Sequence, residues 1–106
     1  MARLRGGQAV ARAIGAEGID HVFGIVGTHN SLLFDGLTDL DDIRVVTTRH
    51  EGGAAHMAEA YGKLTGKPGV CFVTRGPGAT HASIGVHTAS QDSTPLVLVI
   101  GQVNSA

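Results

Sequence analysis

The sequence predicts an α/β fold with a parallel sheet, and three observations support this prediction. Short β-rich runs alternate with amphipathic or small-residue stretches along the chain. A helix precedes each of four such runs, an order that calls for parallel strands, right-handed crossovers and helices on both faces of the sheet. With 106 residues, 42% of them hydrophobic, the chain can bury a core. We therefore expect a three-layer α/β/α arrangement with strand order 2-1-3-4, the commonest doubly wound start.

Four strands are expected, at residues 21–26, 43–48, 70–74 and 96–100. The second run is partly polar, which suits a sheet edge, and the third is apolar on both faces, which suits a central strand. The fourth run is wholly apolar, although the expected order places it at the other edge, where it would be a pairing hazard. Either more chain lies beyond residue 106 or another molecule covers that edge.

Four helices are expected, at residues 8–17, 31–40, 51–65 and 78–91. Gly18 and Gly66 are positioned to end the first and third helices. Asn30 or Ser31 can cap the second helix. In the third helix an apolar stripe repeats every three or four residues, and we expect it to pack on the sheet. Its members are Ala54, Met57, Ala58, Tyr61 and Leu64.

Composition argues against several classes of protein. The formal net charge is -1, no Lys/Arg-rich run is present and aromatic residues make up 4%, so nucleic-acid binding is not expected. No apolar run reaches membrane-spanning length. A single cysteine, Cys71, rules out an internal disulfide and fits a reducing compartment, so we expect a cytoplasmic protein. Cys71 lies mid-strand and is expected to be a small buried hydrophobe rather than a nucleophile.

Ligands of doubly wound sheets bind outside the carboxyl ends of the strands. In this sequence that end carries residues 27–30, 49–51, 75–78 and 101–102. Glu51 falls in the first turn of a helix, where an acidic residue can simply satisfy free N–H groups and the helix dipole. It can equally be a carboxylate held at a ligand site, to hydrogen-bond a ring nitrogen or exchange a proton. Position alone leaves both interpretations open.

The turn Gly76-Pro77-Gly78 could cradle a phosphate, but it matches neither the P-loop nor the GxGxxG pattern. A close-packed strand–helix turn is the plainer interpretation. Six histidines raise the question of a metal site. The pairs His50/His56 and His81/His87 are six residues apart, whereas a helical metal pair requires a spacing of four, so no metal is expected. We expect His50 at the ligand end.

Seven segments resemble a known family. They are FGIVGTHN (23–30), RHEGGAA (49–55), MAEAYG (57–62), TGKPGVC (65–71), TRGPGAT (74–80), QDSTP (91–95) and GQV (101–103). In this order and spacing they closely resemble the pyrimidine-binding (PYR) domain of thiamine-diphosphate enzymes, in the branch that contains acetolactate synthase and 2-oxo-acid decarboxylases. The resemblance covers nearly the whole chain.

The resemblance implies a catalytic role for Glu51. In the family, the matching glutamate hydrogen-bonds N1′ of the aminopyrimidine of thiamine diphosphate, which lets the cofactor lose the proton on its thiazolium C2 and act on 2-oxo acids. The expected cofactor-binding residues are Glu51, Gly27, Thr28, Gly76, Pro77 and Gly78. The residues expected on the substrate side are His29, Asn30 and Gln102.

Two departures from the family pattern stand out. Arg75 occupies a position where the family usually has a small residue, often serine. Family PYR domains have six strands, so residues 1–106 are expected to form a single, partial PYR domain that lacks the last strands. The diphosphate-binding domain, which holds Mg²⁺ through a Gly-Asp-Gly...Asn motif, has no counterpart here. We therefore expect that domain to come from the same or another subunit. We also expect the protein to form a homodimer and the isolated chain to be inactive.

Two other functions stay open on the residues alone. The chain could be a non-catalytic α/β fragment that self-associates through the apolar run 96–100. It could also be a flavodoxin-like module that binds a phosphate or nucleotide with residues 76–78.

Overall fold

The computed structural model describes residues 5–27 and 30–103 and contains every element expected from the sequence, with bounds within two residues of those predicted. The elements, in chain order, are α1 (Gly6–Ala16), β1 (His21–Gly24), α2 (Ser31–Thr38), β2 (Arg44–Thr47), α3 (Glu51–Thr65), β3 (Gly69–Thr74), α4 (Pro77–Asp92) and β4 (Leu96–Gly101). Among the described residues, no helix is both long and apolar enough to cross a membrane.

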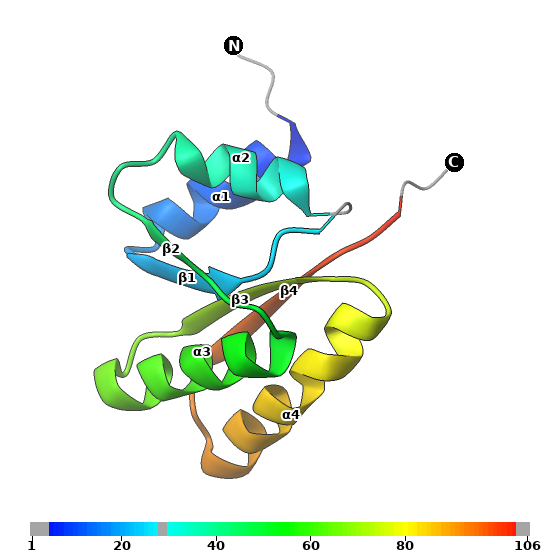
Figure 1. Cartoon of the computed structure of the whole chain (residues 1–106). Helices are drawn as coiled ribbons and strands as arrows, with labels where there is room; N and C mark the ends of the chain where they lie inside the picture. The colour runs from blue at the N-terminus through cyan, green and yellow to red at the C-terminus, as the bar shows by residue number, and fades with distance from the viewer. Residues whose placement is uncertain (1–4, 28–29, 104–106) are drawn as a thin grey trace.

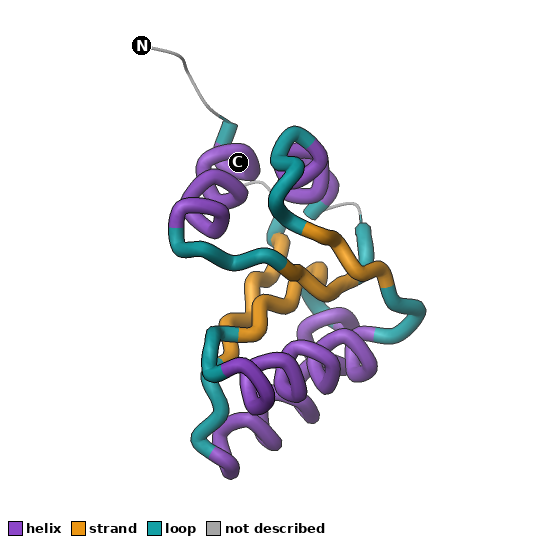
Figure 2. The backbone as a smooth tube through the Cα atoms, turned by 90° about the vertical axis from the view of Figure 1, so that its left-hand side faces the viewer, coloured by secondary structure: helices purple, strands orange, loops and turns teal. Residues whose placement is uncertain are grey.

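The four strands form one parallel sheet in the order β2-β1-β3-β4, which confirms the predicted order. Helices α1 and α2 cover one face and α3 and α4 cover the other (Figure 1), and the view along the sheet in Figure 2 separates these three layers. The partly polar β2 and the apolar β4 are the two edges, and Val97 and Ile100 of β4 are exposed. Because all strand pairs are parallel, the carboxyl ends of the four strands lie together at one end of the sheet, next to the starts of α2, α3 and α4.

The core has two parts because strand side chains alternate between the two faces. Phe72 of β3 points toward α1 and α2, and its ring meets that of Phe34 edge-on at a centroid distance of 5.6 Å. Cys71 and Val73 point the other way, into a layer of alanines from α3 and α4. Cys71 is fully buried, as predicted, and burial, helped by the charge of Glu51, raises the pKa of its thiol to about 12.

The apolar stripe predicted for α3 is wrong at two positions. Ala54 and Ala58 are buried, but Met57 is 47% exposed and Leu64 is 86% exposed. The reason is that α3 packs against α4 as well as the sheet, so its contact face turns toward its smallest residues. A Cβ atom on Gly85 of α4 would come within 2.4 Å of the Cβ of Ala55. The helices can approach so closely because both residues at the contact, Gly85 and Ala55, are small.

Two predictions about helix ends have different outcomes. Gly66 adopts the left-handed conformation (φ 74°) that ends α3, as predicted. Asn30 occupies the N-cap position of α2, but its side chain makes no capping bond, so that part of the prediction is wrong. Its amide group instead holds the loop that precedes α2.

Candidate functional site

The start of α3 is fixed on the sheet by the turn that follows β2. The N–H of Thr48 donates to the carbonyl of Gly24 at 2.9 Å, and the Oγ1 of Thr48 donates to the carbonyl of His50 at 3.1 Å. His50 is the N-cap residue, and its Nδ1 accepts from the N–H of Gly52 at 2.9 Å. These bonds place Glu51 at the first position of the helix, where the helix dipole favours a negative charge.

Glu51 makes a contact that the sequence did not reveal. Its Oε1 lies 3.0 Å from Nδ1 of His81, a residue thirty positions later in α4. The side chain of Glu51 is 18% exposed and that of His81 is 49% exposed. The ring of His81 also stacks on that of His50, with centroids 4.7 Å apart and an interplanar angle of 27°. The candidate site is therefore formed by the N-terminal ends of α3 and α4, which lie next to each other.

The charge state of Glu51 follows from opposing influences. Burial, the largest single one, raises the pKa of Glu51. Its own backbone N–H, the hydrogen bond from His81 and the charges of both histidines act the other way, and together they hold the pKa below its ordinary value of 4.5. At neutral pH the carboxylate is ionised and accepts only, so Nδ1 of His81 carries the proton and donates it.

Thr74, the last residue of β3, lies against two predicted cofactor-binding glycines, of which Gly78 also lies beside Glu51. A Cβ atom on Gly27 would lie 3.1 Å from Cβ of Thr74. A Cβ atom on Gly78 would lie 3.2 Å from Cγ2 of Thr74 and 3.6 Å from Oε2 of Glu51. The Oγ1 of Thr74 is buried and has no hydrogen-bond partner among the described residues. The fold thus places Gly27 and Gly78 against Thr74, whose hydroxyl group is unsatisfied among the described residues, and places Gly78 beside Glu51 as well.

The turn between β3 and α4 is formed by the predicted residues. Gly76 has a positive φ of 64° and is the N-cap of α4, and Pro77 is at the first helical position. The carbonyl of Gly76 accepts from both the N–H and the Oγ1 of Thr80, at 2.9 and 3.0 Å. Gly76, Pro77 and Arg75 are exposed, whereas Gly78 is buried against Thr74.

The residues predicted on the substrate side have separate positions. Asn30 is only 3% exposed. Its Oδ1 accepts from the N–H of Gly27 at 2.6 Å and its Nδ2 donates to the carbonyl of Ile25 at 3.0 Å, so it shapes the loop that carries Gly27. Gln102 is exposed just after β4, and its Oε1 accepts from the N–H of Val103. Thr28 and His29 lie outside the described residues.

Donor atoms of His50, Glu51 and His81 lie within 4.8 Å of one another, a grouping that the spacing of histidines on single helices did not predict. The Nδ1 of His50 is already bonded to the N–H of Gly52. A neutral imidazole that accepts at Nδ1 carries its proton on Nε2, so this ring has no free lone pair. Two ligands remain, fewer than the three or four of protein zinc sites. The absence of a metal site stays a prediction.

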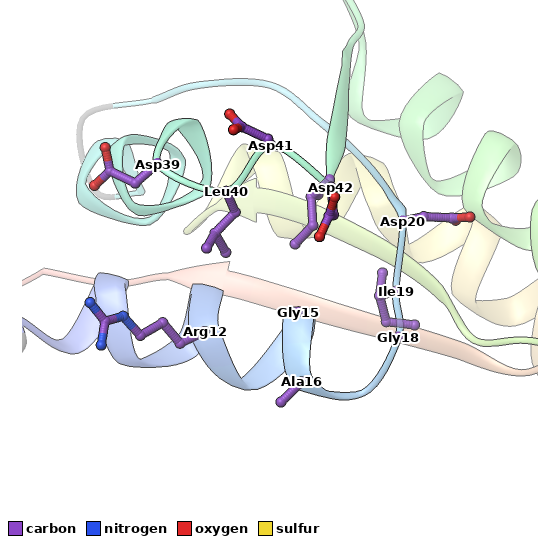
Figure 3. Close-up of a pocket in the computed structure, with 11 residues that line it drawn as sticks. Arg12, Gly15, Ala16, Gly18, Ile19, Asp20, Asp39, Leu40, Asp41 and Asp42 are labelled. Atoms are coloured by element: carbon purple, nitrogen blue, oxygen red, sulfur yellow. The ribbon is translucent and has the colours of Figure 1, made fainter.

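A hollow of about 770 Å³ lies at the opposite end of the sheet. Its walls come from α1 and from the segments that precede β1 and β2, including Asp20, Asp39, Asp41 and Asp42. Figure 3 shows these four carboxylates pointing in different directions rather than toward a common centre. Asp20 is already hydrogen-bonded to Tyr61 and His21. The hollow is therefore an acidic surface feature distant from Glu51.

Comparison with known proteins finds one matching family along nearly the whole chain. Residues 4–106 match the family described as "Thiamine pyrophosphate enzyme, N-terminal TPP binding domain". The chain is 50% identical over 101 residues to a probable 2-ketoarginine decarboxylase of Pseudomonas aeruginosa. This alignment covers 95% of this chain and 18% of that protein. It is 44% identical over 103 residues to the acetolactate synthase large subunit of Buchnera aphidicola, and 42% identical over 103 residues to the acetolactate synthase of Bacillus subtilis. Each of those alignments covers 97% of this chain and 18% of the relative.

Proposed function

Because the chain belongs to the family of N-terminal TPP-binding domains of thiamine pyrophosphate enzymes, we propose that it is the cofactor-activating part of an enzyme that acts on 2-oxo acids. The family implies thiamine diphosphate as the cofactor. The substrate class comes from the relatives, whose names describe a 2-ketoarginine decarboxylase and acetolactate synthases. The chain spans about 18% of the length of these relatives, so the activity belongs to a larger assembly.

The observation that carries the proposal is the carboxylate of Glu51 at the start of α3. It is largely buried, one of its oxygens is held by His81, and the other lies beside Gly78. A carboxylate in such a place can share a proton with a ring nitrogen. We assign Glu51 the contact to N1′ of the aminopyrimidine. When bound, the cofactor supplies a nucleophilic thiazolium carbon and an electron sink.

The residues around Glu51 fit a flat, partly polar ring. Gly27 and Gly78 add no side chain next to Thr74, and the Oγ1 of Thr74 is a buried polar atom without a partner among the described residues. Exclusion of water by a ligand would strengthen the effect that burial already has, and would raise the pKa of Glu51 toward the value at which a proton is shared. The turn at Gly76 and Pro77 completes the cofactor side of the proposed site.

The rest of the active site would come from elsewhere. We propose that a diphosphate-binding domain of the same or another subunit supplies Mg²⁺, and that the assembly is a homodimer. We assign His29 and Gln102 to the substrate side, where Asn30 acts through the loop that it holds. Thr28 is assigned to the cofactor-binding residues. The 106-residue chain alone is expected to bind thiamine diphosphate weakly and to show no decarboxylation of 2-oxo acids with Mg²⁺ present.

The proposal is tested by deuterium exchange at C2 of thiamine diphosphate, followed by proton NMR with the chain in excess. The chain should accelerate the exchange over buffer, and Glu51→Gln should abolish the acceleration because an amide cannot share the proton in the same way. The control is Glu17→Gln, which alters an exposed carboxylate next to α1 and should leave the exchange unchanged. Equal acceleration by Glu51→Gln would contradict the assignment.

A further inference from the structure

We propose that His81 is a positioning residue that holds Oε1 of Glu51 through its Nδ1 and thereby directs Oε2 to the ligand side, next to Gly78. Neither the family match nor the names of the relatives assign a role to this histidine. The inference deepens the proposed function and rests on it for the identity of the ligand. The hydrogen bond itself belongs to the ligand-free chain.

The first support is the geometry of the carboxylate. The two oxygens of Glu51 have different surroundings: Oε1 lies 3.0 Å from Nδ1 of His81, whereas Oε2 lies 3.6 Å from where a Cβ atom on Gly78 would be. A charge-assisted hydrogen bond from an imidazole N–H restricts rotation of the carboxylate group. A carboxylate held at one oxygen presents the other in a defined direction.

The second support is the way in which His81 is itself held. It lies one turn into α4, and α4 is fixed on α3 by the contact between Gly85 and Ala55. Toward the other end of these helices, Nζ of Lys63 lies 2.6 Å from Oδ2 of Asp92 and 3.3 Å from Oε1 of Glu59. Two contacts between the helices, Gly85 with Ala55 and Lys63 with Asp92, thus set the distance between α3 and α4. That distance determines how far the side chain of His81 lies from Glu51.

The third support is the stack of His50 on His81. The Nδ1 of His50 is bonded to the N–H of Gly52, which fixes the plane of its ring. The ring of His81 lies 4.7 Å from it and is nearly parallel to it. Stacking restricts the plane of the His81 ring, and in this plane Nδ1 lies 3.0 Å from Oε1 of Glu51. The third titratable group near Glu51, the thiol of Cys71, stays neutral because its pKa is about 12, and it does not compete for the role.

The test uses the ligand-free 106-residue chain and ¹³C NMR of the Glu51 carboxyl group over pH. Loss of a donor to the charged form raises a carboxyl pKa, so in His81→Ala the pKa of Glu51 should rise. In His81→Asn an amide nitrogen can take the place of Nδ1, and the pKa should stay close to that of the wild type. In His81→Gln the amide lies one bond farther out, and the pKa should rise as in His81→Ala.

A second variant separates the two roles of His50, which stacks on His81 and caps α3. His50→Asn keeps a side-chain oxygen that can accept from the N–H of Gly52, but it removes the ring. Its thermal unfolding should match that of the wild type, while the pKa of Glu51 should rise part of the way. If every variant at positions 50 and 81 titrates like the wild type, or if His81→Asn shifts Glu51 as far as His81→Ala does, the inference is wrong.

Binding gives the second readout. The affinity for thiamine diphosphate should fall about 2- to 10-fold in His81→Ala, the effect of one lost hydrogen bond, and return in His81→Asn. The two readouts separate the claims. A wild-type chain that does not bind the cofactor, with the expected NMR shifts, would refute the proposed function and leave the contact between His81 and Glu51 intact. A chain that binds the cofactor with no NMR shifts and no change in affinity would refute the role of His81 alone.

Discussion

Gly85 of α4 lies directly against Ala55 of α3, so close that a methyl group on Gly85 would come within 2.4 Å of the Cβ of Ala55 and 2.8 Å of its carbonyl carbon. This contact sets the spacing of the two helices, and the spacing decides whether His81 reaches Glu51. A glycine inside a helix normally lowers stability. Here its missing side chain is what lets the site form.

Gly85→Ala should therefore destabilise the chain despite the better helix propensity of alanine. Overpacking typically costs about 1–3 kcal/mol, against a propensity gain of about 1 kcal/mol. The free energy of unfolding, from urea denaturation, should fall, and the NMR signals of Glu51 and His81 should move because α4 is displaced.

The matched control is Gly53→Ala. Gly53 is also inside a helix, but a Cβ atom there would meet nothing within 4 Å. This change should raise the free energy of unfolding by about 0.5–1 kcal/mol. An increase of the same size in Gly85→Ala would contradict the close packing of α3 on α4.

The second prediction concerns Leu64, whose side chain is exposed. Leu64→Ala should change the free energy of unfolding by less than about 0.5 kcal/mol, since 86% of the residue is already in solvent. Leu37→Ala, at a residue that is only 1% exposed, should cost about 2–5 kcal/mol. Both are measured by urea denaturation. Comparable losses in the two variants would mean that Leu64 packs on the sheet, as its helical spacing predicts.

A third prediction concerns Asp20, far from the proposed site. Its carboxylate accepts from the hydroxyl of Tyr61 and lies 2.9 Å from Nδ1 of His21, and these bonds lower the pKa of Asp20 from 3.8 to about 2. Because the pKa is lower in the folded than in the unfolded chain, the ionised group favours the folded state above pH 3.8. This stabilisation should disappear as the pH falls from about 4 to about 2.

Tyr61→Phe removes the first of these bonds and keeps the ring. The pKa of Asp20, followed by ¹³C NMR, should rise, and the difference in thermal unfolding between variant and wild type should narrow as the pH falls through the same range. If variant and wild type unfold alike at every pH between 5 and 2, Tyr61 acts through its ring contacts with His21 and Phe23, which the variant keeps, and not through its hydroxyl group.

Local pattern was enough to predict the framework. The alternation of β-rich runs and helical stretches determined the order of elements and, with the polarity of residues 43–48, the order of strands. The position of Glu51 at a helix start and the role of Gly66 as a helix end are also local properties, because caps depend on a few neighbouring residues. The family resemblance could be recognised from the sequence for the same reason, since its motifs are short and contiguous.

Tertiary structure decided which side chains meet. A period of three or four residues describes an apolar face but not the partner against which it packs, so it placed Met57 and Leu64 inside, whereas contact with α4 turned α3 toward Ala55. Asn30 looked like a helix cap by sequence, and only the folded loop shows its amide bonded to Gly27 and Ile25. The contact between His81 and Glu51 joins residues thirty positions apart and depends on how closely two helices pack, a distance that no local pattern encodes.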